Sequence, residues 1–300
     1  MEPNLPTAGL AAAGVACDVA AFAAVRATAA ELPGLRQQPG PAGHPLPPAF
    51  LKHADEQTVV ALAAVSRAID AGGLAGTDFR DWGAVASPRF LGRVAMAAAV
   101  QRFAREGAWG VSPHLIPHRS LHSISGTVSQ ALKLHGPNFG SGGGPGGAEE
   151  ALLTATTLLQ GGSLRGVWLV LTGWDPEPVP DAKGAPPAGV VCAGLALALT
   201  PARAGWPGLR LRVAFGPPGR NGSTGQPAGR MTPLSLEALL ETLGGVNLPA
   251  AVLWQLGGGG WLELERGRTG NGTAAPRKAA AANGACQAAA PGGAGTEKMS

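Results

Sequence analysis

The chain has 300 residues, of which 47 are glycine and 27 are proline, and it contains no tyrosine. Charged residues make up only 14% and the net charge is +4 without any basic run, which argues against a nucleic-acid-binding protein. The three cysteines, Cys17, Cys192 and Cys286, are too few and too far apart for a disulfide framework or a metal site. The composition therefore favours a compact α/β protein rich in small residues, with one or more disordered pieces.

The sequence shows no signal for export or membrane insertion. It starts Met1-Glu2-Pro3-Asn4, without the basic segment of a signal peptide. Its apolar runs are interrupted by charges or are too short to span a bilayer. We therefore expect a cytoplasmic protein that does not contact a membrane.

The first third of the chain predicts a strand, a loop and a well-bounded helix. Alanine and valine dominate Leu10 to Val25, where we expect a buried strand followed by a helix. The many prolines of residues 33–49 indicate an extended loop. Asp55 is a good N-cap for the next helix, which Gly72-Gly73 should end.

The remaining segments alternate between helical and strand patterns. A helix over Arg93–Arg105 presents many alanines and should pack closely, and Val167–Thr172 is a continuous apolar run typical of a buried strand. The other predicted strands are Trp82–Ala86, Val190–Leu199, Leu209–Phe215 and a pair around Gly257–Gly260, and the other helices are Ser123–Leu134 and Ser235–Leu243.

A glycine-rich loop, Gly136–Gly147, precedes one further buried helix. Gly142-x-Gly144-x-x-Gly147 formally matches a dinucleotide-binding fingerprint, but no hydrophobic strand stands directly before it. No Lys-Ser or Lys-Thr follows the glycines, so a phosphate-binding P-loop is also disfavoured. We expect no cofactor and no metal. Glu149 and Glu150, in the first helical turn, could form an acid/base pair but are more typical of charges that favour the helix dipole.

The middle of the chain resembles a known family. Its segments follow one another as in the N-terminal half of β-ketoacyl synthases, which belong to the thiolase-fold superfamily. In order, they are Gly110-Val111-Ser112-Pro113, a helix containing Ser123–Leu132, Gly136-Pro137, a loop of small residues, an Ala/Leu helix and the strand Val167–Thr172. The resemblance covers about residues 8–216. It implies an α/β fold with the topology of a thiolase-like half: a mixed, mostly parallel five-stranded sheet covered by helices.

The resemblance also suggests how the chain divides. Residues 1–216 would form the ketosynthase N-terminal-half-like domain, and residues 217–267 a short C-terminal extension that packs on it. Residues 268–300 consist largely of Ala, Gly, Pro and polar side chains, and they predict a disordered tail.

The departures from the family pattern decide the functional hypothesis. Active ketosynthases carry a nucleophilic cysteine at the start of the buried helix, and the matching position here is Pro145. Their two catalytic histidines come from a second half of the fold, whereas the last histidine of this chain is His135. The resemblance therefore implies a catalytically degenerate protein that does not condense acyl groups. Its expected role is that of an accessory or chain-length-factor-like partner of an active ketosynthase in fatty-acid or polyketide-type biosynthesis.

Two other functions remain open. His118 and His122, with Ser123 and Ser125, could build an acyltransferase or hydrolase with a serine nucleophile; without proof of contact, these residues are more typical of a surface or interface before a helix. A plain scaffold or binding subunit is the third possibility.

The resemblance also implies partners. We expect a homodimer, or a heterodimer with a full-length ketosynthase, but no nucleic acid; an acyl carrier protein is a further candidate partner. We place Val167–Thr172 at the dimer interface, so that Val170→Lys would split the dimer or leave the protein insoluble.

Overall fold

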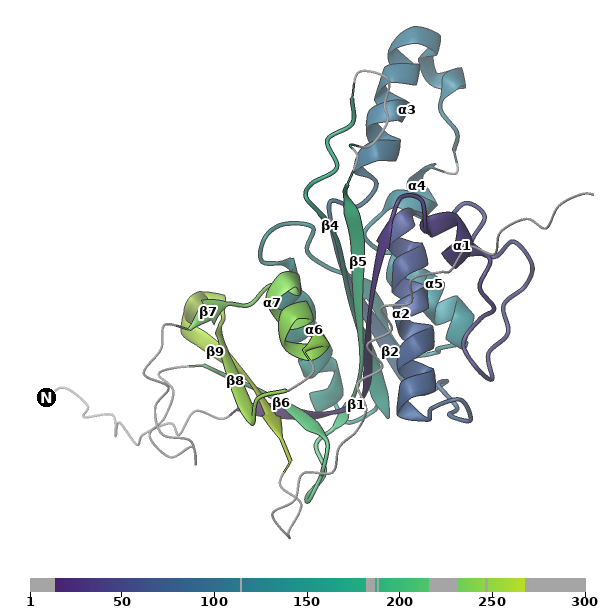
Figure 1. Ribbon diagram of the computed structural model, residues 1–300. Helices are drawn as coiled ribbons and strands as arrows, with labels where there is room; N and C mark the ends of the chain where they lie inside the picture. The colour runs from purple at the N-terminus through teal and green to yellow at the C-terminus, as the bar shows by residue number, and fades with distance from the viewer. Residues whose placement is uncertain are drawn as a thin grey trace, which may run out of the picture.

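The computed structural model describes residues 14–113, 115–181, 187, 189–215, 231–245 and 248–267 (Figure 1). Its strands are β1 (Val15–Thr28), β2 (Trp82–Arg89), β3 (Asn138–Gly140), β4 (Gly166–Asp175), β5 (Val191–Pro201), β6 (Leu209–Phe215), β7 (Thr232–Pro233), β8 (Ala251–Gln255) and β9 (Gly260–Arg266). Its helices are α1 (Leu32–Arg36), α2 (Glu56–Gly72), α3 (Arg93–Glu106), α4 (Leu115–Arg119), α5 (Ser123–Leu132), α6 (Gly147–Gln160) and α7 (Leu236–Gly244), with short 3₁₀ turns η1 (Gly107–Gly110) and η2 (Gly257–Gly259).

One sheet joins all the strands of the described residues, in the order β3-β2-β4-β5-β1-β6-β9-β8-β7. Helices α1, α2, α4 and α5 lie on one side of it, and α6 and α7 on the other (Figure 1). Each side has its own apolar cluster, so the sheet is the middle layer of three. The predicted mixed sheet covered by helices is confirmed.

The sheet is larger than the five strands expected, and its strand directions are more mixed. Nine strands are present in the described part of the chain, of which β7, β8 and β9 lie within residues 217–267. The parallel pairs there are β2–β3, β2–β4 and β7–β8, and the other pairs are antiparallel. The resemblance ends at about residue 216. The five strands that it implies therefore do not include β7, β8 and β9.

Strand β4 contains the apolar run Val167–Thr172 and lies in the sheet interior. It pairs in parallel with β2 from Gly166 to Gly173 and antiparallel with β5 from Val167 to Asp175, and Val170 faces Ala86 on one side and Ala196 on the other. The expectation that this strand forms a dimer interface is therefore wrong. A continuous apolar run indicates that both faces of a strand are covered. This holds for a central strand of a single-chain sheet as well as for a strand at a dimer interface.

Strand β1 replaces the strand and helix expected in Leu10–Val25. Its 14 residues pair with β5 from Cys17 to Thr28 and with β6 from Val15 to Val19. Alanine favours helices in isolation, but pairing with β5, and with β6 over the first residues, overrides that preference.

Helix boundaries followed local signals closely. The Asp55 carboxylate accepts a hydrogen bond from the Gln57 backbone N–H at 2.9 Å and so caps α2, which ends at Gly73 in the left-handed conformation (φ 66°). Ser235 caps α7 in the same way through the Ala238 N–H at 3.1 Å. The ends predicted for α2 are confirmed. No helix of the described residues is long and apolar enough to cross a membrane.

The contact between β5 and α2 gives a first test. A β-carbon added at Gly194 would lie 2.8 Å from Val60 Cγ1 and 3.3 Å from the Val60 carbonyl oxygen, whereas one added at Gly34 meets nothing within 4 Å. We expect Gly194→Ala to lower the free energy of unfolding by about 1–3 kcal/mol, because the core must shift to fit a methyl group. Gly34→Ala should leave it unchanged or slightly higher. Denaturant unfolding measures both, and equal effects of the two substitutions would contradict this packing.

Candidate functional site

The glycine loop, Gly136–Gly147, contains β3 and leads into α6, and it contacts β2 and the segment just before α5. The Ser141 N–H donates a hydrogen bond to the Ala86 carbonyl at 2.8 Å, which continues the pairing of β3 with β2. A β-carbon on Gly147, the first residue of α6, would lie 2.5 Å from the Ser87 hydroxyl, and one on Gly140 would clash with the Leu121 carbonyl. These positions are glycine because neighbouring backbone and Ser87 fill the space a side chain would need.

Pro145 lies exposed, just before α6 begins. The N-cap position, Gly146, offers no side chain to the free N–H groups of the first helical turn. The position that the family resemblance assigns to a nucleophile therefore carries a ring that cannot donate, accept or attack.

Glu149 connects α6 to the far end of the sheet. Its carboxylate accepts a hydrogen bond from the Gly257 N–H at 2.8 Å, in the turn between β8 and β9. The contact gives Glu149 a structural role across 108 residues of sequence. Glu150 is exposed in the same turn of the helix.

The Ser/His arrangement considered from the sequence is partly present. Ser125 Oγ lies 3.3 Å from His122 Nδ1, and its hydroxyl also donates to the His122 carbonyl oxygen at 3.1 Å. Ser125 is fully buried, however, and a serine nucleophile must reach a substrate carbonyl. Ser123 is also buried, and its hydroxyl has no hydrogen-bond partner among the described residues.

His118 is placed elsewhere. Its ring lies 6.1 Å from that of His53, centroid to centroid, beside the start of α2. The next residue, Arg119, forms an ion pair with buried Asp55 (Nε to Oδ2, 3.2 Å). Thus His122, Ser123 and Ser125 share the first turn of α5 or its cap, whereas His118 faces another part of the molecule. Among the described residues, no group of three or more His, Cys, Asp or Glu side chains could hold a metal ion.

The described cysteines are poor nucleophiles. Cys17 and Cys192 are both completely buried, in β1 and β5. Burial raises the pKa of Cys17 to about 12, and it also raises the pKa of Cys192 well above the ordinary value. Cys286 lies outside the described residues. A thiolate at neutral pH is therefore unfavourable at both described positions.

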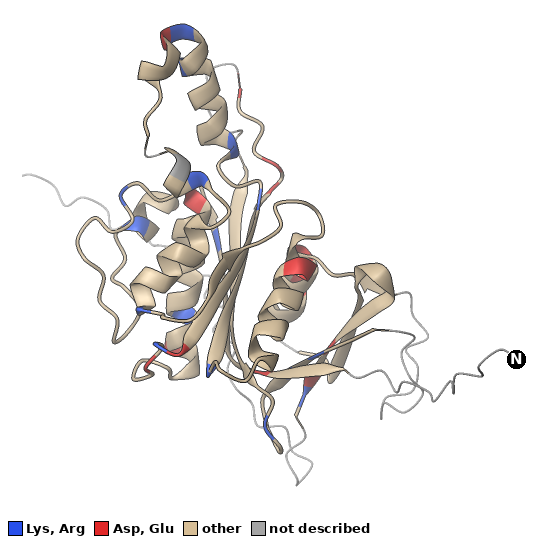
Figure 2. Cartoon of the chain, turned by 180° about the vertical axis from the view of Figure 1, so that it is seen from behind, with Lys and Arg blue, Asp and Glu red and all other residues tan. Residues whose placement is uncertain are grey.

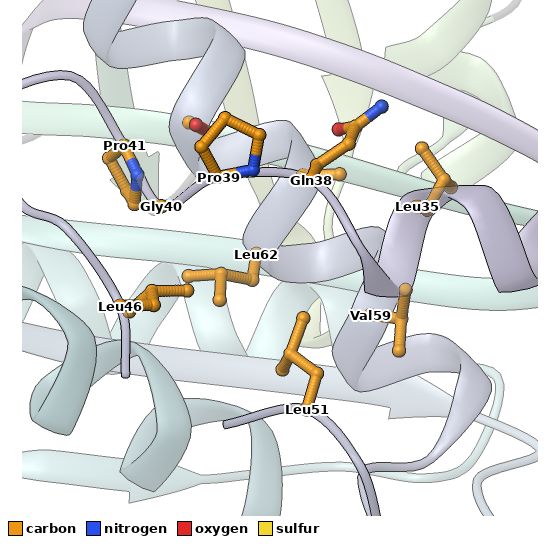
Figure 3. Close-up of a pocket in the computed structure, with 11 residues that line it drawn as sticks. Leu35, Gln38, Pro39, Gly40, Pro41, Leu46, Leu51, Val59 and Leu62 are labelled. Carbon is orange, nitrogen blue, oxygen red and sulfur yellow. The ribbon is translucent and has the colours of Figure 1, made fainter. Parts of the chain in front are cut away.

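Two hollows on the described surface are too small for an acyl chain. One lies between α1, the following loop and α2, where Leu35, Leu46, Leu51 and Leu62 are among the lining residues (Figure 3). Its cavity volume is about 10 Å³, and that of a second hollow beside Trp174 is about 20 Å³. Each has room for about one water molecule.

Sequence reasoning missed the buried charge at the base of α2. Asp55 was identified as a helix cap, but its ion pair with Arg119 joins residues 64 positions apart, and no local pattern signals it. Burial raises the pKa of Asp55 to about 7; neighbouring Glu56 adds to the rise and Arg119 opposes it. Ser87, under the start of α6, was missed for the same reason.

Comparison with known proteins gives a structural likeness and no sequence match. No protein-family model and no curated protein sequence matches this chain. A type II polyketide synthase ketosynthase in complex with its acyl-carrier protein (AntDE:AntF) is similar at a TM-score of 0.48 and 14% identity, covering 62% of either chain. The ketosynthase ApeO with its chain length factor ApeC, from Xenorhabdus doucetiae, gives a TM-score of 0.46 and 15% identity over 83% of this chain and 99% of that one.

A β-ketoacyl synthase from Burkholderia phymatum is similar at a TM-score of 0.44 and 15% identity, over 62% of this chain and 59% of that one. The chain is similar to these ketosynthase structures, and it spans about three fifths of the length of the first of them.

The raised pKa of Asp55 predicts a pH dependence. An unfolded aspartate has a pKa of about 3.9, so between about pH 4 and 7 the folded state holds a proton that the unfolded state releases. The stability that Asp55 contributes is therefore complete below about pH 4 and is lost as the pH rises to about 7. Asp55→Asn keeps an oxygen for the Gln57 N–H but cannot ionise. We expect the free energy of unfolding to fall over this window more steeply in the wild type, by a few kcal/mol in all.

Asp78→Asn is the matched control for this experiment. Asp78 is exposed, and hydrogen bonds from Arg80 lower its pKa to about 2. Its replacement should alter the pH dependence only below about pH 4. Parallel stability curves for the wild type and Asp55→Asn from pH 4 to 7 would show that Asp55 is already ionised throughout.

Proposed function

We propose that the chain is a catalytically degenerate β-ketoacyl synthase-like subunit. It acts as an accessory, chain-length-factor-like partner of an active ketosynthase in fatty-acid or polyketide-type biosynthesis. The observation that carries the proposal is the start of α6, where an exposed proline, Pro145, stands at the position matched to the nucleophile.

The remaining chemistry supports the same conclusion. Burial suppresses the thiolate form of Cys17 and Cys192. Every histidine of the sequence precedes the glycine loop, whereas the two catalytic histidines that the resemblance implies would follow α6. A condensation by the mechanism of that family would therefore lack its nucleophile and these two histidines.

The open edge of the sheet supports a partner subunit. Strand β3 is the first strand of the sheet and pairs only with β2 among the described strands. Phe139 at its centre is 45% exposed, and none of its three residues is charged. Unprotected edges of this kind are templates for pairing with another chain. The partner's edge would join at β3, in place of the Val167–Thr172 strand expected from the sequence. Contact with an acyl carrier protein belongs to the same proposal.

A second candidate function rests on the contact between Ser125 and His122. An acyltransferase or hydrolase could use this pair if α5 shifted to expose the serine hydroxyl. Full burial of Ser125 weighs against it, and Ser125→Ala would abolish any such activity.

The proposal predicts the outcome of a condensation assay. The purified chain, given malonyl and acyl groups on acyl carrier protein, should form no product above a blank without protein. Pro145→Cys should also form none, because it restores a thiol at a helix N-terminus without the histidines. An active ketosynthase in the same assay is the positive control, and adding this chain to it should change the length of its products. Product formed by the chain alone, and abolished by a substitution in it, would refute the proposal.

A further inference from the structure

Helix α3 and the turn η1 form an arm, residues 93–110, that projects beyond the end of the sheet (Figure 1). None of the 14 residues of α3 is buried, and every residue from Val100 to Trp109 is exposed. This differs from the close packing expected of its alanines. A helix of this length has marginal stability in water on its own and normally depends on packing.

The arm carries exposed apolar side chains, three of them at the spacing of one helix face. Met96, Val100 and Phe103 are 44%, 63% and 56% exposed, and Trp109 in η1 is completely exposed. The first three are spaced by four and then three residues, which is the seam of a helix that packs along another helix. Charged residues on α3 lie near its base and tip, and the stretch between them is uncharged (Figure 2).

The base of the arm is held in place. Arg93 forms an ion pair with Glu177 at 2.7 Å, and its guanidinium lies 5.7 Å from the Phe90 ring centroid. Gly92, which precedes α3, is buried against the Arg119 side chain. The arm is thus anchored at its start while its apolar seam has no cover within the described residues.

We propose that the arm pairs with the arm of a second copy of this chain, with the two α3 helices antiparallel. Val100 stands near the middle of the seam, so antiparallel pairing brings Met96 of one copy to Phe103 of the other. Parallel pairing would place Arg102 and Arg105 beside their own counterparts, and like charges at close range repel. Antiparallel pairing separates these arginines and directs Glu106 towards Arg93 of the second copy. The interaction is independent of the function proposed above.

The size of the seam sets the expected affinity. Half-exposed Phe103 and fully exposed Trp109 offer on the order of 300 Å² of aromatic surface. A standard interface buries about 800 Å² per partner. The arm should therefore give a dimer with a dissociation constant in the micromolar range, which forms and separates with concentration.

Sedimentation velocity on the full chain, from about 1 to 200 µM, tests the proposal. The wild type should shift from monomer to dimer over this range. Phe103→Ser should weaken dimerisation at least about tenfold without changing the melting temperature, because the side chain supports no core. Phe215→Ser, the same substitution at a phenylalanine that is 53% exposed on β6, should change it less than about twofold.

Cysteine crosslinking tests the direction of pairing. In a Cys286→Ser background, Val100→Cys should form a disulfide-linked dimer under oxidation, whereas Met96→Cys should not, because antiparallel pairing separates the two Met96 positions. Efficient crosslinking through Met96→Cys would refute the antiparallel arrangement.

Three results would overturn self-pairing. One is a monomer at every concentration. Another is a dimer that Phe103→Ser leaves intact, which would point to the β3 edge and leave the proposed function standing. The last is a monomer that binds vesicles of phosphatidylcholine and phosphatidylglycerol and loses that binding in Phe103→Ser, which would assign the arm to a membrane surface. Failure of the condensation prediction alone would leave the arm proposal untouched.

Discussion

The backbone before α6 runs so close to β2 and to the segment just before α5 that parts of it have no room for a β-carbon. The tightest contacts are Gly147 against the Ser87 hydroxyl and Gly140 against the Leu121 carbonyl. They fix where β3 pairs with β2 and where α6 begins, and therefore how α6 lies on the sheet. The same loop leads to exposed Pro145 at the start of α6, the position to which the family resemblance assigns a nucleophile.

Much of the fold could be predicted wherever local chemistry decides it. The ends of α2 follow from the Asp55 cap and from Gly73, and the continuous apolar run predicts the buried strand β4. Only the first part of β1 could be predicted as a strand, because the alanines that follow favour a helix until β5 pairs with them. Strands β3 and β7, of three and two residues, carry no periodicity to detect.

The candidate site was harder to predict than the fold, because its geometry depends on contacts between residues that are far apart in the sequence. His118 and His122 are close in sequence, yet one lies beside His53 and the other lies over Gly126 in α5. The link from Glu149 to Gly257 and the ion pair of Arg119 with Asp55 have no local signature. Together these contacts place the polar groups in structural roles and leave two surfaces without cover in the described chain: the β3 edge and the seam of α3. We therefore expect the protein to act by binding other molecules at these two surfaces.

The central claim is that no group at the start of α6 forms a covalent bond with an acyl chain. Intact-mass measurement of the full chain, after incubation with an acyl thioester of pantetheine, tests it most directly. The account predicts an unchanged mass for the wild type and one added acyl group for Pro145→Cys, since only the variant carries an exposed thiol at the helix N-terminus. A wild-type chain that gains one acyl group, mapped by peptide sequencing to the glycine loop or to the first turn of α6, would contradict it.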